Sequence, residues 1–195
     1  LLFLAQGVYV STLRYVCFRS DIDLSYFVSA LHWRARGEVL LHTPMIGESF
    51  LSHHVSLLLL LLEGPFHVLG GYPPSLIWMQ TAAVALASFP LYYVARAQSG
   101  DPRSGLLAVV LFLGCRAVVG SAFCTDFHPI VFLPLPLFAA VLGMYRNSWA
   151  WALVGLVGSL LVQEDAPLVV AAVACVFRPA GCSRRLRVTL VAAGL

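Results

Sequence analysis

The sequence predicts an all-α protein, a polytopic bundle of transmembrane helices, and three observations lead to that fold class. Hydrophobic residues make up 60% of the 195 residues, charged residues make up only 11%, and the mean hydropathy is +0.88. A soluble domain needs a far larger charged fraction to cover its surface. Several apolar runs also approach the ~20 residues that cross a bilayer, and they lack the alternation of a membrane β-barrel.

Both ends of the chain lie in apolar runs, the first starting at Leu1 and the last beginning near Val188. We therefore expect residues 1–195 to form a single integral membrane domain, an N-terminal fragment of a longer protein that is truncated at both ends. The opening run has neither a basic segment nor a small-residue cleavage site. It is interpreted as the tail of a first membrane helix that ends near Val10, and not as a signal peptide.

The next segment, Ser11 to Ser52, is too polar to cross lipid and is expected to be a long external loop. Within it Asp23 is a candidate N-cap of an interfacial helix with apolar residues at helical spacing, and Gly37 is placed to end that helix. Trp33 and its neighbouring arginines would lie at the level of the lipid headgroups. Val55 to Leu62 is apolar but short, so we expect it to dip into the membrane and return.

Longer apolar runs follow, and the predicted spans cover residues 75–94, 105–124 and 130–145. Two shorter apolar segments, 149–162 and 168–177, are separated by Glu164 and Asp165. One long helix would hold both acids at mid-membrane at a cost of about 3 kcal/mol per charge. We therefore expect two helices that meet at a recessed polar turn.

The charges of the loops predict the topology. Twelve arginines and no lysine give a formal net charge of +3, and they are scattered along the chain, so nucleic acid is not an expected partner. The loops with most arginine, near residues 96–103, 146 and 178–187, alternate with polar loops near residues 126–128 and 164–165. By the positive-inside rule the arginine loops are cytoplasmic, and the polar site loops lie on the external face of the plasma membrane.

Three polar segments, residues 21–54, 123–129 and 163–167, form the candidate functional site. Carboxylates and imidazoles at a membrane face suit the binding of a divalent metal ion and the removal of a proton from a hydroxyl nucleophile. The candidate catalytic residues are Asp23 and Asp126, and the candidate metal ligands are Asp126, His128, His54, Glu164 and Asp165. The alternative for Asp23, Asp126 and His128 is that they only cap helices.

Arg116 interrupts an otherwise apolar span below the predicted external surface. Either it pairs with one of the acids, or it binds the phosphate of a lipid-linked substrate. Helices that begin at Pro129 and near Pro167 would direct their positive ends outward, which favours a bound anion. An anionic ligand is therefore predicted at this face.

Five short motifs stand in order along the chain: Asp23-Leu24 with Gly37 downstream, Gly47-Glu48-Ser49-Phe50, His54-Val55-Ser56, Asp126-Phe127-His128-Pro129 and Glu164-Asp165. Together they resemble the uncharacterised bacterial membrane family called domain of unknown function 2079. That family is similar to the C-type membrane glycosyltransferases, which take a sugar from a polyprenyl-phosphate donor on the outer face of the membrane and carry an essential acid in the first external loop.

The resemblance implies a role for each candidate. Asp23 would be the base or a metal ligand, Asp126 and His128 would complete a metal or donor site, and the Glu164-Asp165 pair would orient the acceptor or the metal. The chain departs from the pattern at His53, where an Asp is expected, and at Val55, which replaces a Phe.

Three functions remain open. The first is a glycosyltransferase in which Asp23 or Asp126 deprotonates an acceptor hydroxyl, and a metal or Arg116 stabilises the phosphate leaving group. The second is a transporter with an acidic ion or proton relay, which requires polar residues through to the cytoplasmic side, and the spans show few. The third is a non-catalytic envelope protein that binds a lipid-linked glycan.

Overall fold

The computed structural model describes residues 1–195 except 39–40, 44–46, 50, 52–54, 178 and 180. The described helices are α1 (Leu2–Val16), α2 (Ile22–Ala35), α3 (Leu58–Val68), α4 (Pro74–Ser99), α5 (Pro102–Gly114), α6 (Arg116–Val119), the π-helical turn η3 (Gly120–Cys124), the 3-10 turn η4 (Pro129–Phe132), α7 (Pro134–Arg146), α8 (Trp149–Val162), α9 (Ala166–Val176) and α10 (Arg184–Gly194). A two-residue antiparallel ladder pairs β1 (His42–Thr43) with β2 (Glu48–Ser49), with His42 opposite Ser49 and Thr43 opposite Glu48.

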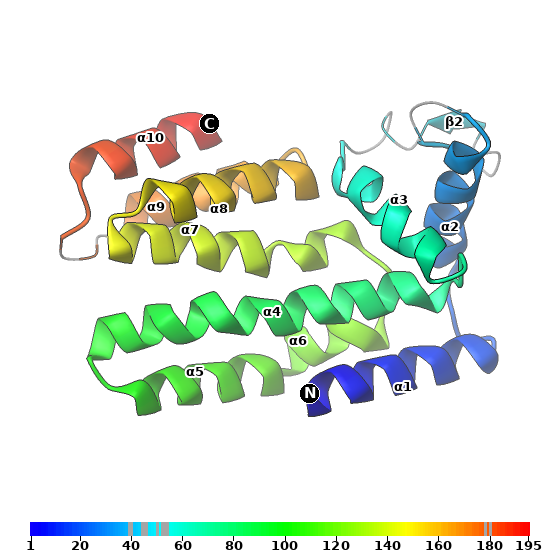
Figure 1. The fold of residues 1–195 in the computed structure, drawn as a ribbon, viewed down its shortest axis with the longest axis horizontal. Helices are drawn as coiled ribbons and strands as arrows, with labels where there is room; N and C mark the ends of the chain where they lie inside the picture. The colour runs from blue at the N-terminus through cyan, green and yellow to red at the C-terminus, as the bar shows by residue number, and fades with distance from the viewer. Residues whose placement is uncertain (39–40, 44–46, 50, 52–54, 178, 180) are drawn as a thin grey trace.

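The long helices run side by side, and α4 lies at the centre, packed against α1, α5 and α7 (Figure 1). On the far side of α7 lie α8 and α9, and α10 covers them. The helices α2 and α3 have a different direction and lie across one end of the bundle (Figure 1). This is the arrangement expected of interfacial helices above a set of membrane helices.

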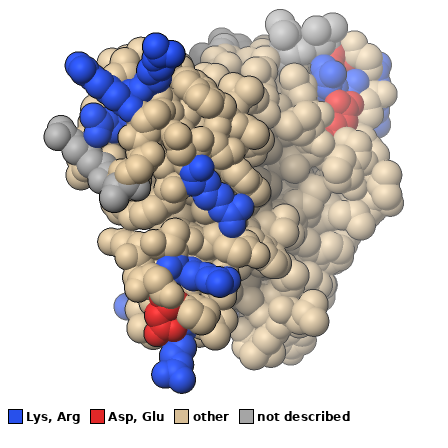
Figure 2. Space-filling view, turned by 60° about the vertical axis from the view of Figure 1, so that its left-hand side comes forward, with Lys and Arg blue, Asp and Glu red and all other residues tan. Residues whose placement is uncertain are grey.

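The connections between the long helices fall at two ends of the bundle (Figure 1). One end holds the described residues between Cys17 and Pro73, the turn 124–128 and the turn 163–165, and is called the acid-bearing end. The opposite end holds the α4–α5, α7–α8 and α9–α10 connections, where arginines gather (Figure 2), and is called the arginine-bearing end. The structure therefore brings the three polar segments to one end.

Two helical stretches are long and apolar enough to cross a membrane, the 26-residue α4 and the 18-residue stretch Pro129–Arg146. They agree with the spans predicted at 75–94 and 130–145. The short helices α8 and α9 are also separate, as predicted, with residues 163–165 between them. The described chain is thus helical with two candidate spans, or three if the bent pair described next is one span.

The stretch predicted as a span over residues 105–124 is not one continuous helix, and it counts as a span only if its two bent parts are taken together. The chain breaks at Cys115, which has the extended dihedrals φ −65° and ψ 128°, and the two helical parts meet at a bend of 53°. Gly114, a weak helix former, precedes the break. The break makes Arg116 the first residue of α6, where its side chain is exposed.

Two other boundaries differ from the sequence prediction. The helix α1 continues past Val10 to Val16, so Arg14 lies on a helix and not in the loop. The helix α3 continues past Leu62 to Val68, and within this extension Glu63 pairs with Arg34 of α2, with Nε and Oε2 2.6 Å apart. Each extension adds to the acid-bearing end a helical residue that takes part in an ion pair, Arg14 in α1 and Glu63 in α3.

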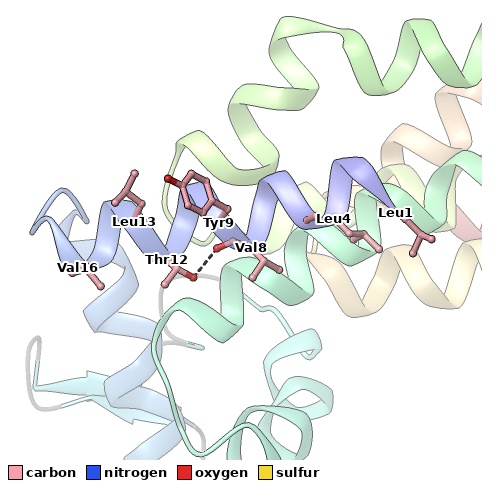
Figure 3. A pocket seen from close by; sticks show the side chains of 8 residues that line it. Leu1, Leu4, Val8, Tyr9, Thr12, Leu13 and Val16 are labelled. Atoms are coloured by element: carbon pink, nitrogen blue, oxygen red, sulfur yellow. Dashed lines mark hydrogen bonds between the residues drawn. The ribbon is translucent and has the colours of Figure 1, made fainter.

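The outward faces of the helices are apolar. Leu106, Leu107, Val110 and Leu111 of α5 are 58–67% exposed. The outer face of α1 carries Leu1, Leu4, Val8, Tyr9, Leu13 and Val16 around an open groove of about 810 Å³ (Figure 3). The Thr12 hydroxyl on this face donates to the carbonyl oxygen of Val8 at 2.6 Å, so this polar group is satisfied within the helix. Such surfaces suit contact with lipid tails.

Candidate functional site

Asp126 lies at the start of α2, although more than one hundred residues separate the two in sequence. Its Oδ2 atom accepts the backbone N–H of Asp21 at 2.5 Å, and the N–H of Leu24 also faces it. The residue at the N-cap of α2 is Asp21, and its own side chain makes no capping bond. Asp126 therefore caps α2 from a distant part of the chain. The sequence also offers helix capping as the role of Asp126, but it predicts a cap for the helix that follows Asp126 and not for α2.

The second oxygen of Asp126 faces an arginine that the sequence had placed in the loop. The Nη2 atom of Arg14 lies 3.5 Å from Oδ1 of Asp126, and the Asp126 side chain is only 2% exposed. Burial raises the pKa of Asp126, whereas the Asp21 N–H and the charge of Arg14 oppose that shift. Asp126 thus connects three segments: it pairs with Arg14 of α1, it caps the start of α2, and it belongs to the 124–128 turn itself.

Gln80 of α4 fixes the turn that carries Asp126 and His128. It is fully buried, its amide nitrogen donates to the carbonyl oxygen of Ser121 at 2.7 Å, and its amide oxygen accepts the backbone N–H of His128 at 2.8 Å. One side chain therefore satisfies the backbone on both sides of the turn. No sequence motif pointed to Gln80, since its partners lie more than forty residues further along the chain.

His128 is half-buried, and its Nδ1 atom lies 2.6 Å from the carbonyl oxygen of Phe127. Because a carbonyl oxygen only accepts, Nδ1 is the donor in this contact, and Nε2 takes no part in it. Nε2 is therefore the His128 nitrogen that a ligand could contact.

Asp23 lies in the first turn of α2, after the N-cap, and its side chain is exposed. The acid that faces a cavity is Asp21. This cavity has a volume of about 420 Å³, and Asp21 lines it together with Tyr15 and with the hydroxyl residues Ser20, Ser25 and Ser29. The sequence reasoning missed Asp21 as a site candidate because Asp23 matched the family motif.

Glu164 joins the third polar segment to the first. Its Oε2 atom accepts the backbone N–H of Val55 at 2.9 Å, next in sequence to His54. Asp165 is the N-cap residue of α9, and its side chain is exposed. The predicted ligand His54 lies outside the described residues.

The arginine that pairs with a buried acid is Arg14, whereas the sequence suggested Arg116 for that role. Arg116 is exposed at the start of α6 and contacts no carboxylate within the described part of the chain. Arg14 makes the ion pair with the buried acid instead. In the sequence Arg14 falls within the segment from Ser11 to Ser52 that was expected to be a loop, and no spacing links it to Asp126.

The surroundings of Asp126 do not suit a metal ion, because N–H donors and a guanidinium already face its carboxylate. Among the described residues, no group of three or more His, Cys, Asp or Glu side chains could hold a metal ion. Glu164 accepts the N–H of Val55, and the residue before Val55 in the sequence, His54, lies outside the described residues.

The apolar outer faces, the candidate spans and the charged ends define a helical membrane protein. Residues 14–195 match the model of a family described as a predicted membrane protein, DUF2079, and the chain belongs to this family. The resemblance to that family inferred from the five motifs is thus confirmed. No curated protein and no solved structure matches the chain.

Proposed function

We propose that the protein is a membrane glycosyltransferase that moves a sugar from a polyprenyl-phosphate donor to an acceptor at the acid-bearing end. The observation that supports this most directly is the cavity beside α2, where the Asp21 carboxylate lies among serine hydroxyls and aromatic side chains. Hydroxyl and carboxylate groups on an apolar wall are suited to a sugar, which has many hydroxyls and needs orientation.

In the proposed reaction the Asp21 carboxylate takes the proton of an acceptor hydroxyl. The acceptor oxygen then bonds to the anomeric carbon, the bond from that carbon to the phosphate oxygen breaks, and polyprenyl phosphate leaves with the electron pair. Asp23, two residues further along the chain and exposed, is the second candidate base. Arg116, exposed and without a carboxylate partner among the described residues, is the proposed ligand of the phosphate.

Asp126 has a different role in this proposal. It is buried and bonded to α2, so it positions Asp21 and does not reach a substrate. Glu164, Asp165 and His54 are the proposed ligands of a divalent metal, because carboxylate and imidazole suit such ions and Glu164 accepts the N–H of Val55, the residue after His54 in the sequence. No step of the reaction above passes through that metal.

The test is sugar transfer from a radiolabelled polyprenyl-phosphate donor in membranes that contain the protein. We expect Asp21→Asn to reduce transfer at least a hundredfold, because general base catalysis contributes about 10² to 10⁴ in rate. Asp101→Asn is the matched control, because Asp101 lies at the arginine-bearing end and asparagine also caps α5. Absence of transfer from a panel of donors, or equal transfer by Asp21→Asn and the unchanged protein, would overturn the proposal.

Two other assays distinguish the alternative functions, a glycan-binding protein and a transporter. A glycan-binding protein would retain a labelled lipid-linked sugar without ever transferring it. A transporter would need polar side chains that continue through the spans, but Gln80 and Thr81 of α4 donate to the carbonyl oxygens of Ser121 and Ala122 and so fasten helices together. Uptake of solute that depends on Glu164 would favour the transporter.

The proposed topology places the acid-bearing end outside the cell and the arginine-bearing end in the cytoplasm. Cys17 is exposed at the first end and Cys182 is partly exposed at the second. We expect a membrane-impermeant maleimide on intact cells to label a variant that keeps Cys17 alone, and to leave a variant that keeps Cys182 alone unlabelled until the cells are opened. The reverse pattern would overturn the topology.

A further inference from the structure

The arginine-bearing end contains a cavity of about 460 Å³ that involves two helices ending at the same level. It is lined by Arg96, Tyr93, Ala97 and Gly100 of the α4 end and by Arg146, the last residue of α7. The guanidinium of Arg146 lies over the ring of Tyr93, 5.0 Å from its centroid. The cavity therefore presents two permanent positive charges, one of them held in place by an aromatic ring.

Neither charge is neutralised by an acid within the described residues. The nearest acid in sequence, Asp101, uses Oδ1 to accept the backbone N–H of Arg103 at 2.9 Å, where it caps α5. Both arginines lie in last turns, where they also offset the negative ends of the helix dipoles. That effect alone would not require the two side chains to share one cavity.

An apolar stripe on α4 leads from the bundle's middle to this cavity. Leu86, Phe89 and Tyr93 follow at helical spacing on one face, and they are 51%, 64% and 41% exposed. Arg96 and Gly100 continue the same face beyond Tyr93. The stripe thus changes from apolar to positively charged at the end of a helix that is long enough to cross a membrane.

We propose that Arg96, Arg146 and Tyr93 form a binding site for the phosphate of an anionic phospholipid, whose acyl chains lie along Leu86 and Phe89. A free phosphate ion would use the two guanidinium groups but would gain nothing from the apolar stripe, whereas a phospholipid matches both parts. Basic pockets at the ends of transmembrane helices are suited to anionic headgroups. This site lies at the opposite end from the proposed transferase cavity and does not depend on that function.

The test is the retention of phosphatidylglycerol by the detergent-purified protein, measured by native mass spectrometry over a lipid titration. Arg96→Ala/Arg146→Ala removes the two charges of the cavity. Arg184→Ala/Arg185→Ala is the matched control, because it removes two exposed arginines from the same end without touching the cavity. At about 1 kcal/mol per arginine, we expect the first pair to weaken retention by about 30-fold and the control pair by less than about threefold.

Two further probes identify the source of the phosphate. Inorganic phosphate should not displace phosphatidylglycerol, and phosphatidylcholine should bind more weakly than phosphatidylglycerol. Phe89→Gln should weaken retention of the lipid without altering the binding of inorganic phosphate. Equal losses in the two arginine pairs, displacement by inorganic phosphate, or equal retention of the two lipids would each overturn the proposal.

Discussion

The acid-bearing end and the arginine-bearing end carry their charges in opposite ways. At the acid-bearing end, Asp126 bonds to the start of α2 and pairs with Arg14, Arg34 pairs with Glu63, and Glu164 accepts the N–H of Val55. At the arginine-bearing end, the described arginines have no carboxylate partner. Charges at the first end therefore join segments of the chain, and charges at the second end remain available to solvent and lipid phosphate.

The ends also differ in how their charges relate to the helices. Arg184 and Arg185 begin α10, where the helix dipole is positive and a cation is unfavourable. In the proposed topology they would face the negatively charged cytoplasmic leaflet, which would offset that cost. Substitutions should therefore affect folding at the acid-bearing end and membrane contacts at the arginine-bearing end.

The largest effect on stability is expected from Asp126→Ala. This change leaves the Arg14 guanidinium without its partner and the Asp21 N–H without its acceptor, so the free energy of unfolding should fall by about 3 kcal/mol. Thermal unfolding in detergent measures the change. Asp23 is exposed on α2, the helix that Asp126 caps, so Asp23→Ala should change the free energy of unfolding by no more than about 0.5 kcal/mol. Equal effects of the two variants would show that Asp126 does not anchor α2.

A smaller loss is expected from Gln80→Leu. The substitution leaves the Ser121 carbonyl and the His128 N–H unpaired in the interior, at a cost of about 1 to 3 kcal/mol. Gln98→Leu is the control in the same helix, since Gln98 is exposed at the arginine-bearing end. If both leucine variants unfold at the temperature of the unchanged protein, Gln80 is not the residue that fixes the turn.

The contact between α2 and α3 should weaken in acid. His32 faces His67 with ring centroids 5.7 Å apart, and its other neighbours are Phe66 and Arg36. Burial, His67 and Arg36 lower the pKa of His32. The folded state then binds fewer protons than the unfolded state, so stability is retained above the ordinary pKa of 6.5 and decreases as the pH falls below it.

Hydrogen exchange of the α2 and α3 amides measures this weakening. We expect faster exchange below the ordinary His32 pKa, and a much smaller pH dependence in His32→Gln. The His128→Gln variant, altered on the other side of the acid-bearing end, should keep the pH dependence of the unchanged protein. A pH dependence that His32→Gln leaves intact would assign it to another group.

The smallest changes in stability are expected from single arginine substitutions at the two ends. Arg34→Ala breaks a partly exposed ion pair with Glu63 and should cost at most about 1 kcal/mol. Arg185→Ala removes an exposed arginine from the positive end of α10 and should leave the melting temperature unchanged or slightly raised. A clear destabilisation by Arg185→Ala would contradict the contrast between the two ends.

The sequence by itself determined the membrane class, the family, two of the spans and the alternation of polar and arginine loops. These features follow from local composition, because a helix in lipid must be apolar over its whole outward length and its loops carry the remaining charge. For the same reason α8 and α9 could be recognised as separate helices from the two acids between them.

The tertiary structure alone decided which charges meet. Asp126 accepts the N–H of Asp21 across 105 residues of sequence, and Arg14 replaces Arg116 as the partner of the buried acid. Gln80 holds the turn that carries Asp126. The reason is physical: burying a charge or an amide is costly without partners, and those partners can come from any part of the chain. Spacing along the sequence carries no record of such pairs.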